Sequence, residues 1–425
     1  MTQSNGARAA AVAILDAVLG EGKTLAQVSE DKSFLYKLPS GDRARAQRLA
    51  VQVIRTLEPI ERLLAPLLRK SPPLHVMNIL RLATLERSFG QASYGVVNEA
   101  VALASIGKRS QHLAGMVNAV LRALPDPVVI SGPAQMMPRW LRQPLVHAYG
   151  RDVVSLIEAV HANAPSIDLT LRGEAQVDGA QVDGAQVDGA ILLPTGSLRL
   201  RDGGQISTLA GFDDGAFWVQ DAAAAMAVPL LGDVMGKRVL DICAAPGGKT
   251  MQLASRGADV TALDISGPRM ARLAQNLSRT GLAATCVLGD ALTYRSEKPF
   301  DAILLDAPCS ATGTIRRHPE LPYLKDGSEI ANLVALQAQL IDHALTLLAP
   351  KGRMVFASCS LLPAEGEDQL DAMLARHQNL SVISPQMTGI DRAWITPQGA
   401  LRLRPDYWAD LGGMDGFFMV CVQKQ

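Results

Sequence analysis

Two cysteines lie in short segments whose residue types could support covalent chemistry. Cys309 stands in Asp306-Ala307-Pro308-Cys309-Ser310, and Cys359 stands in Ala357-Ser358-Cys359-Ser360. Each segment directly follows an apolar run that is typical of a buried strand. If the two strands are neighbours, about 4.8 Å apart, both thiols stand above the carboxyl edge of a sheet, where ligands bind. The other cysteines, Cys243, Cys286 and Cys421, are expected to be small apolar core residues.

One reaction that such a thiol could support is methyl transfer to carbon 5 of cytosine. That carbon is a weak nucleophile, and a thiolate that adds to carbon 6 makes it able to attack a methyl donor. A base must then remove the carbon 5 proton. A carboxylic acid near ring nitrogen 3 would draw off electron density, and Asp306 is placed for that. Because a free thiol with a pKa of about 8.5 is little ionised at neutral pH, nearby cations are expected, and Arg316 and Arg317 are available.

A small-residue loop follows the apolar strand Arg238–Ile242 and has the sequence Cys243-Ala244-Ala245-Pro246-Gly247-Gly248-Lys249-Thr250. It matches a phosphate-binding P-loop only in part, because Cys243 stands where the first glycine is needed. It also lacks the glycine spacing of a dinucleotide fingerprint. Asp241 and Asp264, with Asp290 after the next strand, suit a ligand that has amino groups and a ribose diol. Three acidic residues at successive strand ends are explained less well as helix caps. S-adenosylmethionine is the ligand that fits.

The elements around these segments predict an α/β fold with a doubly wound, mostly parallel sheet, since strands alternate with helices. The predicted strands are Arg238–Ile242, Val260–Asp264, Ala284–Leu288, Ala302–Asp306 and Met354–Ser358, with a closing strand Phe417–Val422. The predicted helices are 249–256, 268–280, 328–348 and 366–377.

Three domains are expected along the chain. Residues 1–127 form an all-α domain, because apolar residues recur at helical spacing. Its 16 Lys+Arg exceed its 10 Asp+Glu, which points weakly to RNA. A small α+β linker domain occupies 128–215, with one helix over 140–160 and strands at Ile167–Leu171 and Ile191–Leu193. Its repeat of Ala-Gln-Val-Asp-Gly, Ala175–Gly189, is expected to be an extended loop. The α/β domain occupies 216–425.

The bulk composition excludes several classes of protein. The chain has 425 residues, 48% of them hydrophobic, and equal numbers of acidic and basic residues. No run of about 20 apolar residues predicts a membrane span. The five cysteines have neither disulfide nor zinc spacing. We therefore expect a cytoplasmic monomer with reduced thiols and no metal.

The motifs quoted above, together with Arg316-Arg317-His318-Pro319, resemble those of the Sun family of RNA 5-methylcytosine methyltransferases over essentially the whole chain. The front domain resembles the NusB-like helical domain that precedes the catalytic part in members that act on small-subunit rRNA. The resemblance implies 16S rRNA as substrate, Cys359 as nucleophile and Cys309 as the residue that assists proton removal. It also implies a cofactor site made of Ala244, Ala245, Pro246, Gly247, Gly248, Lys249, Thr250, Asp264, Arg269, Asp290 and Asp306.

Some alternatives stay open at this point. DNA cytosine methyltransferases use the thiol of a Pro-Cys segment, so spacing alone does not choose between Cys309 and Cys359. Ala222–Ala225 and Ser358 depart from the family pattern, and neither change is expected to remove activity. His318 is expected to shape its loop. The chain could also methylate tRNA, or be a silent RNA-binding assembly factor.

Overall fold

The computed structural model describes the chain apart from residues 1–2, 31–34, 174–180, 183–184, 187–189 and 201–204. The chain divides into two compact units. The first comprises Met1–Ala164 with Ile315–Asp326, and the second comprises Pro165–Thr314 with Gly327–Gln425. Within the described part of the chain, no helix has the length and apolar character needed to cross a bilayer. The three-domain boundaries expected above remain a prediction.

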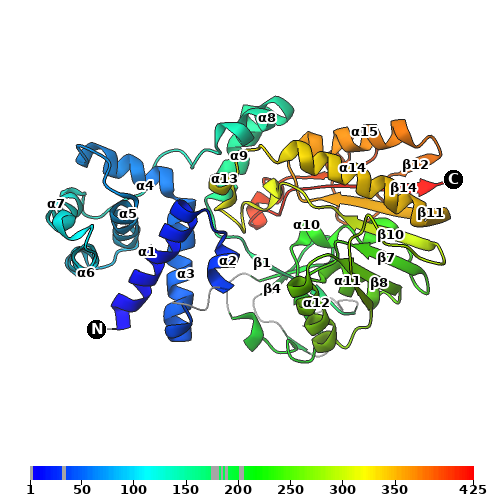
Figure 1. The fold of residues 1–425 in the computed structure, drawn as a ribbon, viewed down its shortest axis with the longest axis horizontal. Coiled ribbons are helices and arrows are strands. Elements are labelled where there is room, and N and C mark those ends of the chain that lie inside the picture. Colours follow the sequence, from blue (N-terminus) through cyan, green and yellow to red (C-terminus); the bar gives the residue numbers. More distant parts are fainter. Residues whose placement is uncertain (1–2, 31–34, 174–180, 183–184, 187–189, 201–204) are drawn as a thin grey trace. The chain divides into compact units, whose positions relative to one another are not determined.

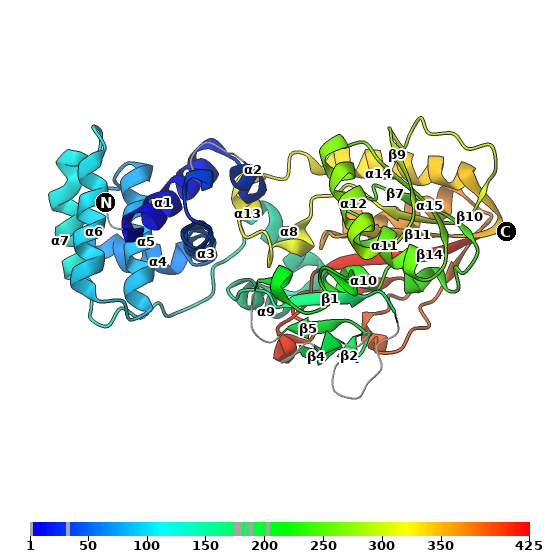
Figure 2. The same ribbon diagram turned by 90° about the horizontal axis from the view of Figure 1, so that it is seen from below.

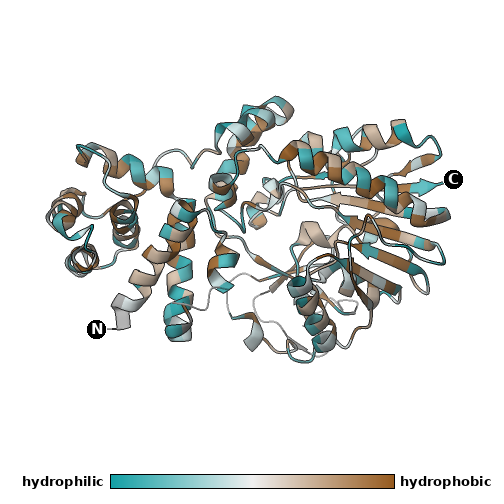
Figure 3. Cartoon of the chain, viewed as in Figure 1, coloured by the Kyte–Doolittle hydropathy of each residue, from teal (hydrophilic) through white to brown (hydrophobic). Residues whose placement is uncertain are grey.

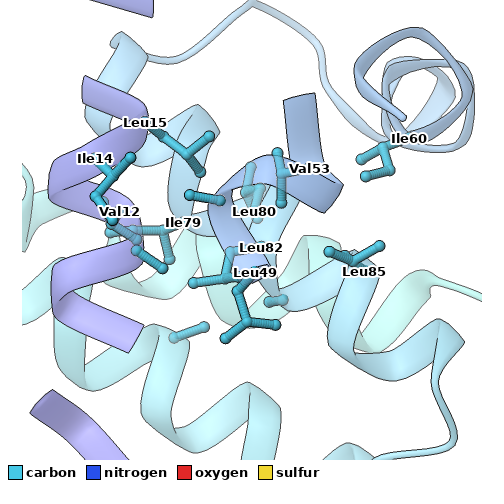
Figure 4. Packing of buried hydrophobic residues seen from close by; sticks show 14 of the residues in the cluster. Val12, Ile14, Leu15, Leu49, Val53, Ile60, Ile79, Leu80, Leu82 and Leu85 are labelled. Atoms are coloured by element: carbon cyan, nitrogen blue, oxygen red, sulfur yellow. The ribbon is translucent and has the colours of Figure 1, made fainter. Parts of the chain in front are cut away.

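The first unit is all-α, as the helical spacing of its apolar residues predicts. Figure 4 shows how side chains of three helices meet in its core: Leu15 of α1, Val53 of α3 and Leu80 of α5 are all fully buried or nearly so. Burial of each such side chain stabilises the fold by about 1.5–3 kcal/mol. The helices of this bundle are α1 (Gln3–Glu21), α2 (Leu25–Glu30), α3 (Ser40–Arg55), α4 (Leu57–Leu64), α5 (Leu74–Ser88), α6 (Ser93–Ile106) and α7 (Ala114–Ala123).

The predicted single helix over 140–160 is wrong. The structure has two helices there, α8 (Arg139–Tyr149) and α9 (Arg151–His161). Gly150 separates them, with φ of 85° and ψ of 161°. A residue with these angles cannot continue a right-handed helix, and glycine adopts them without steric cost.

A late segment of the chain, Ile315–Asp326, belongs to the helical unit. It contains the short helix α13 (Leu321–Leu324). The backbone N–H of Leu25 donates to Glu320 Oε1 over 3.4 Å, and Trp140 Nε1 donates to the Pro322 carbonyl over 3.4 Å. Arg316 and Glu320 are each only 1% exposed. The segment thus packs with the residues of a unit whose other members all precede 165.

A small antiparallel sheet opens the second unit, in the order β4-β5-β1-β6. Figure 2 shows β1 and β5 side by side. On the face opposite its apolar core, the carboxylate of Asp168 accepts hydrogen bonds from Arg199 Nε and Nη2 over 2.6 and 2.8 Å, and from the Ala222 N–H over 2.9 Å. The repeat Ala175–Gly189 lies largely outside the described residues, which include only β2 and β3 of it. The strands are β1 (Ile167–Leu171), β2 (Gln181–Val182), β3 (Ala185–Gln186), β4 (Ala190–Leu192), β5 (Leu198–Leu200) and β6 (Phe217–Val219).

The Asp168–Arg199 pair is expected to be a large contributor to stability. Asp168→Asn leaves the Arg199 guanidinium buried without its counter-charge, because the two side chains are 0% and 1% exposed. The free energy of unfolding in urea should fall by about 3–5 kcal/mol. The matched control is Asp342→Asn, whose side chain is 41% exposed beside Arg376, and its cost should stay below about 1 kcal/mol. Equal costs for the two variants would contradict the assignment.

The main sheet of the second unit has the order β12-β14-β11-β10-β7-β8-β9, with β13 also paired to β14. The pairs from β11 through β9 are parallel, and every pair made by β14 is antiparallel. This confirms the mostly parallel sheet and the closing strand. The strands are β7 (Arg238–Ile242), β8 (Asp259–Asp264), β9 (Thr285–Leu288), β10 (Phe300–Asp306), β11 (Leu348–Ser358), β12 (Leu380–Ile383), β13 (Leu401–Leu403) and β14 (Phe417–Lys424).

Helices cover both faces of this sheet, which makes the fold doubly wound. Alternate residues of the central strands face opposite sides: Val239 packs in the cluster that includes Leu253, and Leu240 packs in the cluster that includes Ile341. Figure 1 shows the layers, and in Figure 3 the strands between them are coloured as hydrophobic. Burial on both faces explains the near-continuous apolar runs of the sequence. The helices are α10 (Ala222–Ala225), α11 (Gly248–Ser255), α12 (Gly267–Thr280), α14 (Ile330–Leu347) and α15 (Glu367–Arg376).

Candidate active site

The two cysteines singled out from the sequence lie next to each other. Their strands, β10 and β11, are parallel neighbours, and Asp306 stands opposite Ala357 in the register. Each chain turns after the strand end, and the Sγ atoms of Cys309 and Cys359 come within 3.3 Å. Two thiols from positions fifty residues apart therefore face one another at the carboxyl edge of the sheet.

The contact between the sulfur atoms shifts the pKa values of the two thiols in opposite directions. A hydrogen bond from the Cys359 thiol stabilises a thiolate on Cys309, and this lowers the pKa of Cys309 against the opposing effect of burial. The same hydrogen bond, with burial, raises the pKa of Cys359 well above its usual value. The first proton of the pair is therefore lost from Cys309, and the second proton is held more tightly by Cys359.

Buried polar groups hold the Cys309 loop in place. Glu365, which is fully buried, accepts the Ser310 N–H at 2.8 Å, and its Oε1 also accepts from Gln337 Nε2 at 3.0 Å. Beyond the loop, the Gly313 N–H donates to the Cys359 carbonyl over 2.9 Å. A Cβ at Gly313 would lie 2.0 Å from the Gly416 carbonyl oxygen, so only glycine allows this close approach. The loop that carries one cysteine is thereby bonded to the backbone of the other.

Lys249 supplies the cation of this site. Its Nζ donates to Asp306 Oδ2 over 2.7 Å and lies 5.3 Å from the centre of the Phe417 ring. Burial lowers the pKa of Lys249, but the nearby carboxylate of Asp306 more than compensates, so the pKa is raised and the side chain stays charged. Its charge opposes the rise in the pKa of Cys359. The two arginines that the sequence offered as cations, Arg316 and Arg317, lie in the segment Ile315–Asp326, which is counted with the helical unit.

The small-residue loop after β7 has the tight geometry that its composition predicts. Gly247 has φ of 106°, and a Cβ there would lie 2.8 Å from Leu273 Cγ. Asp264, at the end of β8, accepts the N–H groups of Ala245 and Ser266 over 3.1 and 2.9 Å. Arg269 donates to the Ala245 carbonyl and lies 3.7 Å from Asp264. A nearly buried carboxylate is therefore fixed beside the turn that leads into α11.

Two further acidic residues take different places. Asp241 is completely buried and accepts from Thr250 Oγ1 over 2.6 Å; burial raises its pKa to about 7. It is bonded to the last residue of the loop and is not among the residues that line the cavity, and its expected contact with a ligand amino group stays a prediction. Asp290 is exposed and accepts the Leu292 N–H over 2.9 Å. Asp290 therefore acts as a cap and still faces the cavity described next.

These residues surround a cavity of about 540 Å³, a size typical of small-ligand sites. The structure brings Asp264, Arg269, Asp290, Asp306, Cys309 and Cys359 together in its lining. Of the loop, Cys243 lines the cavity and Ala244–Thr250 do not. A carboxylate held at the end of β8 and a glycine turn tight against α12 fit a ligand with a ribose diol. The residues present thus fit S-adenosylmethionine.

Asp264 is expected to matter for cofactor affinity. Asp264→Ala removes a ribose acceptor and the bond that fixes the Ala245 N–H, so the Kd for S-adenosylmethionine should rise about 10–100-fold, measured by calorimetry. Asp259→Ala is the matched control, since Asp259 is exposed at the other end of the same strand. An unchanged Kd for Asp264→Ala would remove this residue from the site.

Sequence reasoning missed several residues that shape the site. Glu365 and Gln337 carry no local signature, because Glu365 lies 55 positions from its partner Ser310 and 28 positions from its partner Gln337. The pairing of Lys249 with Asp306 was also missed, although both residues belong to the quoted motifs. Among the described residues, no group of three or more His, Cys, Asp and Glu side chains could hold a metal ion.

Comparison with known proteins identifies the family. The model of the 16S rRNA methyltransferase RsmB/F family matches residues 228–423, and the NusB family model matches residues 5–126. Proteins named ribosomal RNA small subunit methyltransferase B from Salmonella arizonae and Salmonella typhi are each 33% identical over 409 residues, which cover 88% of this chain and 91% of theirs.

Solved structures share the fold. The crystal structure of PH0851 has a TM-score of 0.75 and 21% identity, over 98% of this chain and 99% of that one. NSun6 from Pyrococcus horikoshii has a TM-score of 0.56 and 17% identity, over 68% and 98%. These structures bear on the fold alone. The cavity beside the glycine turn and the extent of the sequence matches lead to one assignment: this chain is an S-adenosylmethionine-dependent methyltransferase with a NusB helical domain, and it belongs to the 16S rRNA methyltransferase RsmB/F family.

Proposed function

We propose that the protein methylates carbon 5 of a cytosine in 16S rRNA, with Cys359 as a covalent nucleophile and Cys309 as the base. The observation that carries this proposal is the 3.3 Å contact of two thiols in the wall of the cofactor cavity. Carbon 5 needs covalent activation before it can accept a methyl group, and a cysteine supplies it. The names of the Salmonella relatives support small-subunit rRNA as the substrate.

Two pairs of residues carry out the proton transfers. One is the thiol pair, and the other is Asp306 with Lys249. The proton between the sulfur atoms moves to Cys309, and the Cys359 thiolate adds to carbon 6 of the ring. Asp306 passes a proton from the Lys249 ammonium, 2.7 Å from its carboxylate, to nitrogen 3 as the thiolate adds, and the same path takes this proton back once carbon 5 has been methylated. Addition of the thiolate to carbon 6 leaves an enamine, whose electron pair makes carbon 5 nucleophilic. When bound, S-adenosylmethionine supplies the electrophilic methyl group.

Release of the product needs a second use of Cys309. Once Cys359 is bonded to carbon 6, Cys309 loses its own proton to solvent and then takes the proton of carbon 5. The electrons of that C–H bond re-form the double bond between carbons 5 and 6, and the sulfur of Cys359 leaves as a thiolate. Two thiols 3.3 Å apart can thus act on adjacent carbons of one ring.

Transfer of a labelled methyl group to purified RNA tests this function. The protein is incubated with S-adenosylmethionine labelled on its methyl group and with 16S rRNA, and the digested RNA is separated into nucleosides. The label is expected in 5-methylcytidine, and bisulfite sequencing then locates the base. Label on tRNA but not on rRNA would change the substrate, and label on another base would overturn the proposed chemistry. Binding of RNA without any methyl transfer would favour the alternative that the protein is an RNA-binding assembly factor without catalytic activity.

Helical residues of the first unit are proposed to bind this RNA. Residues 1–127 carry a net charge of about +6, and the rest of the chain carries about −6. Phosphate contacts by Lys and Arg supply much of the affinity of RNA-binding proteins and make it depend on salt. That the protein is located in the cytoplasm and that it is a monomer remain predictions.

A further inference from the structure

The thiol pair has a chemistry that methyl transfer does not use. A disulfide has an S–S distance of about 2.05 Å, so Cys309 and Cys359 need to approach by only about 1.3 Å from their 3.3 Å contact. Both lie beyond the ends of adjacent strands, in turns whose hydrogen bonds to Glu365 and to the Cys359 carbonyl involve neither sulfur atom. We propose that this pair is a reversible modification site, at which a hydroperoxide oxidises the two thiols to a disulfide.

The oxidation balances with a hydroperoxide as the only co-reactant. The Cys309 thiolate attacks the terminal oxygen of the O–O bond and becomes a sulfenic acid, and the departing alkoxide or hydroxide takes a proton from solvent and leaves as an alcohol or water. The Cys359 sulfur then attacks the Cys309 sulfur, its proton leaves with the hydroxyl group as water, and the S–S bond forms. The two thiols together lose two electrons, and the peroxide gains them. The lowered pKa of Cys309 supports its role as the attacking sulfur.

The geometry gives a reagent access to this pair. Both cysteines are partly exposed and line the cavity of about 540 Å³, which is large enough for a small peroxide. Cys243 lines the same cavity, but burial and the carboxylates of Asp306 and Asp264 raise its pKa to about 12. Burial also raises the pKa of Cys421 to about 11. A peroxide is therefore expected to select the pair.

The disulfide would switch off the proposed function while leaving the cofactor bound. Neither sulfur could then add to a pyrimidine or take a proton from it. The contacts of Asp264 with Ala245 and Ser266 involve no thiol, so cofactor affinity should change little. This consequence for methyl transfer rests on the proposed function, but formation of the disulfide does not.

Mass spectrometry of the whole protein tests the proposal. The reduced protein is treated with one equivalent of hydrogen peroxide, its free thiols are alkylated, and intact and digested samples are analysed. We expect two fewer alkylated cysteines, a disulfide-linked pair of peptides that contain Cys309 and Cys359, and at least a tenfold loss of methyl transfer that dithiothreitol restores. The Kd for S-adenosylmethionine should stay within about threefold.

Variants separate the pair from single cysteines. Cys286→Ser, which removes an exposed thiol on β9, should behave like the natural protein. Cys309→Ala and Cys309→Ser should form no linked peptide. A natural protein in which both thiols remain alkylatable after peroxide treatment would overturn the proposal, as would oxidation of Cys359 alone. A disulfide in a protein whose reduced form methylates no cytosine would leave this site intact and overturn the proposed function instead.

Discussion

Cys359→Ala is expected to reduce methyl transfer to RNA by at least about 10³-fold, because loss of a covalent nucleophile removes a step that no neighbour can replace. Cys309 lies only 3.3 Å away, but it would have to act as nucleophile and base on the same ring. The variant should also form no covalent complex with RNA. Radiolabelled methyl transfer and denaturing gel electrophoresis measure the two effects.

Cofactor binding distinguishes this loss from unfolding. The Kd of Cys359→Ala for S-adenosylmethionine should stay close to that of the natural protein, since Asp264 and Arg269 hold the loop without help from the thiols. Cys286→Ala is the control for a cysteine outside the site. Methyl transfer by Cys359→Ala within about tenfold of the natural rate would show that this sulfur is not the nucleophile.

Cys309→Ala should instead trap RNA on the protein. Addition and methylation can proceed, but removal of the carbon 5 proton loses its base, which typically contributes a factor of about 10² to 10⁴. Turnover should fall by that factor, and a protein–RNA complex stable in detergent should accumulate only when S-adenosylmethionine is present.

The double variant Cys309→Ala with Cys359→Ala tests the origin of that complex. It should form none, because the bond to carbon 6 is made by Cys359. If Cys359→Ala traps RNA and Cys309→Ala does not, the roles of the two cysteines are exchanged. The sequence alone left this choice open, since both stand beyond buried strands.

The fold was largely predictable from the sequence. Strand β7 has the predicted bounds Arg238–Ile242, and β8, β10 and β11 end at the predicted residues. These strands are buried on both faces, so their apolar runs are long and end abruptly at polar residues. The helix predicted over 140–160 failed for a local reason, because the backbone of Gly150, with φ of 85°, turns the chain between two helices.

The candidate site was predictable in its motifs but not in its contacts. A strand end tells which residues reach the carboxyl edge, and the neighbouring strands then decide which of them meet. The order of β7, β10 and β11 brings Lys249 to Asp306 and Cys309 to Cys359. No sequence spacing specifies that order. Glu365 was missed for the same reason, because its importance comes from burial under the Cys309 loop.

The helical unit is discontinuous in sequence, and this affects how the molecule can be divided. Twelve residues that begin only six positions after Cys309 are counted among its parts, and their Arg316 and Glu320 are interior groups there. A protease cut or gene split near residue 164 would separate those charged groups from the helices that shelter them. The N-terminal half would lose part of its core, and the C-terminal half would keep the charged segment Ile315–Asp326 without its packing partners. Loss or exchange of the NusB domain as a separate piece is therefore disfavoured.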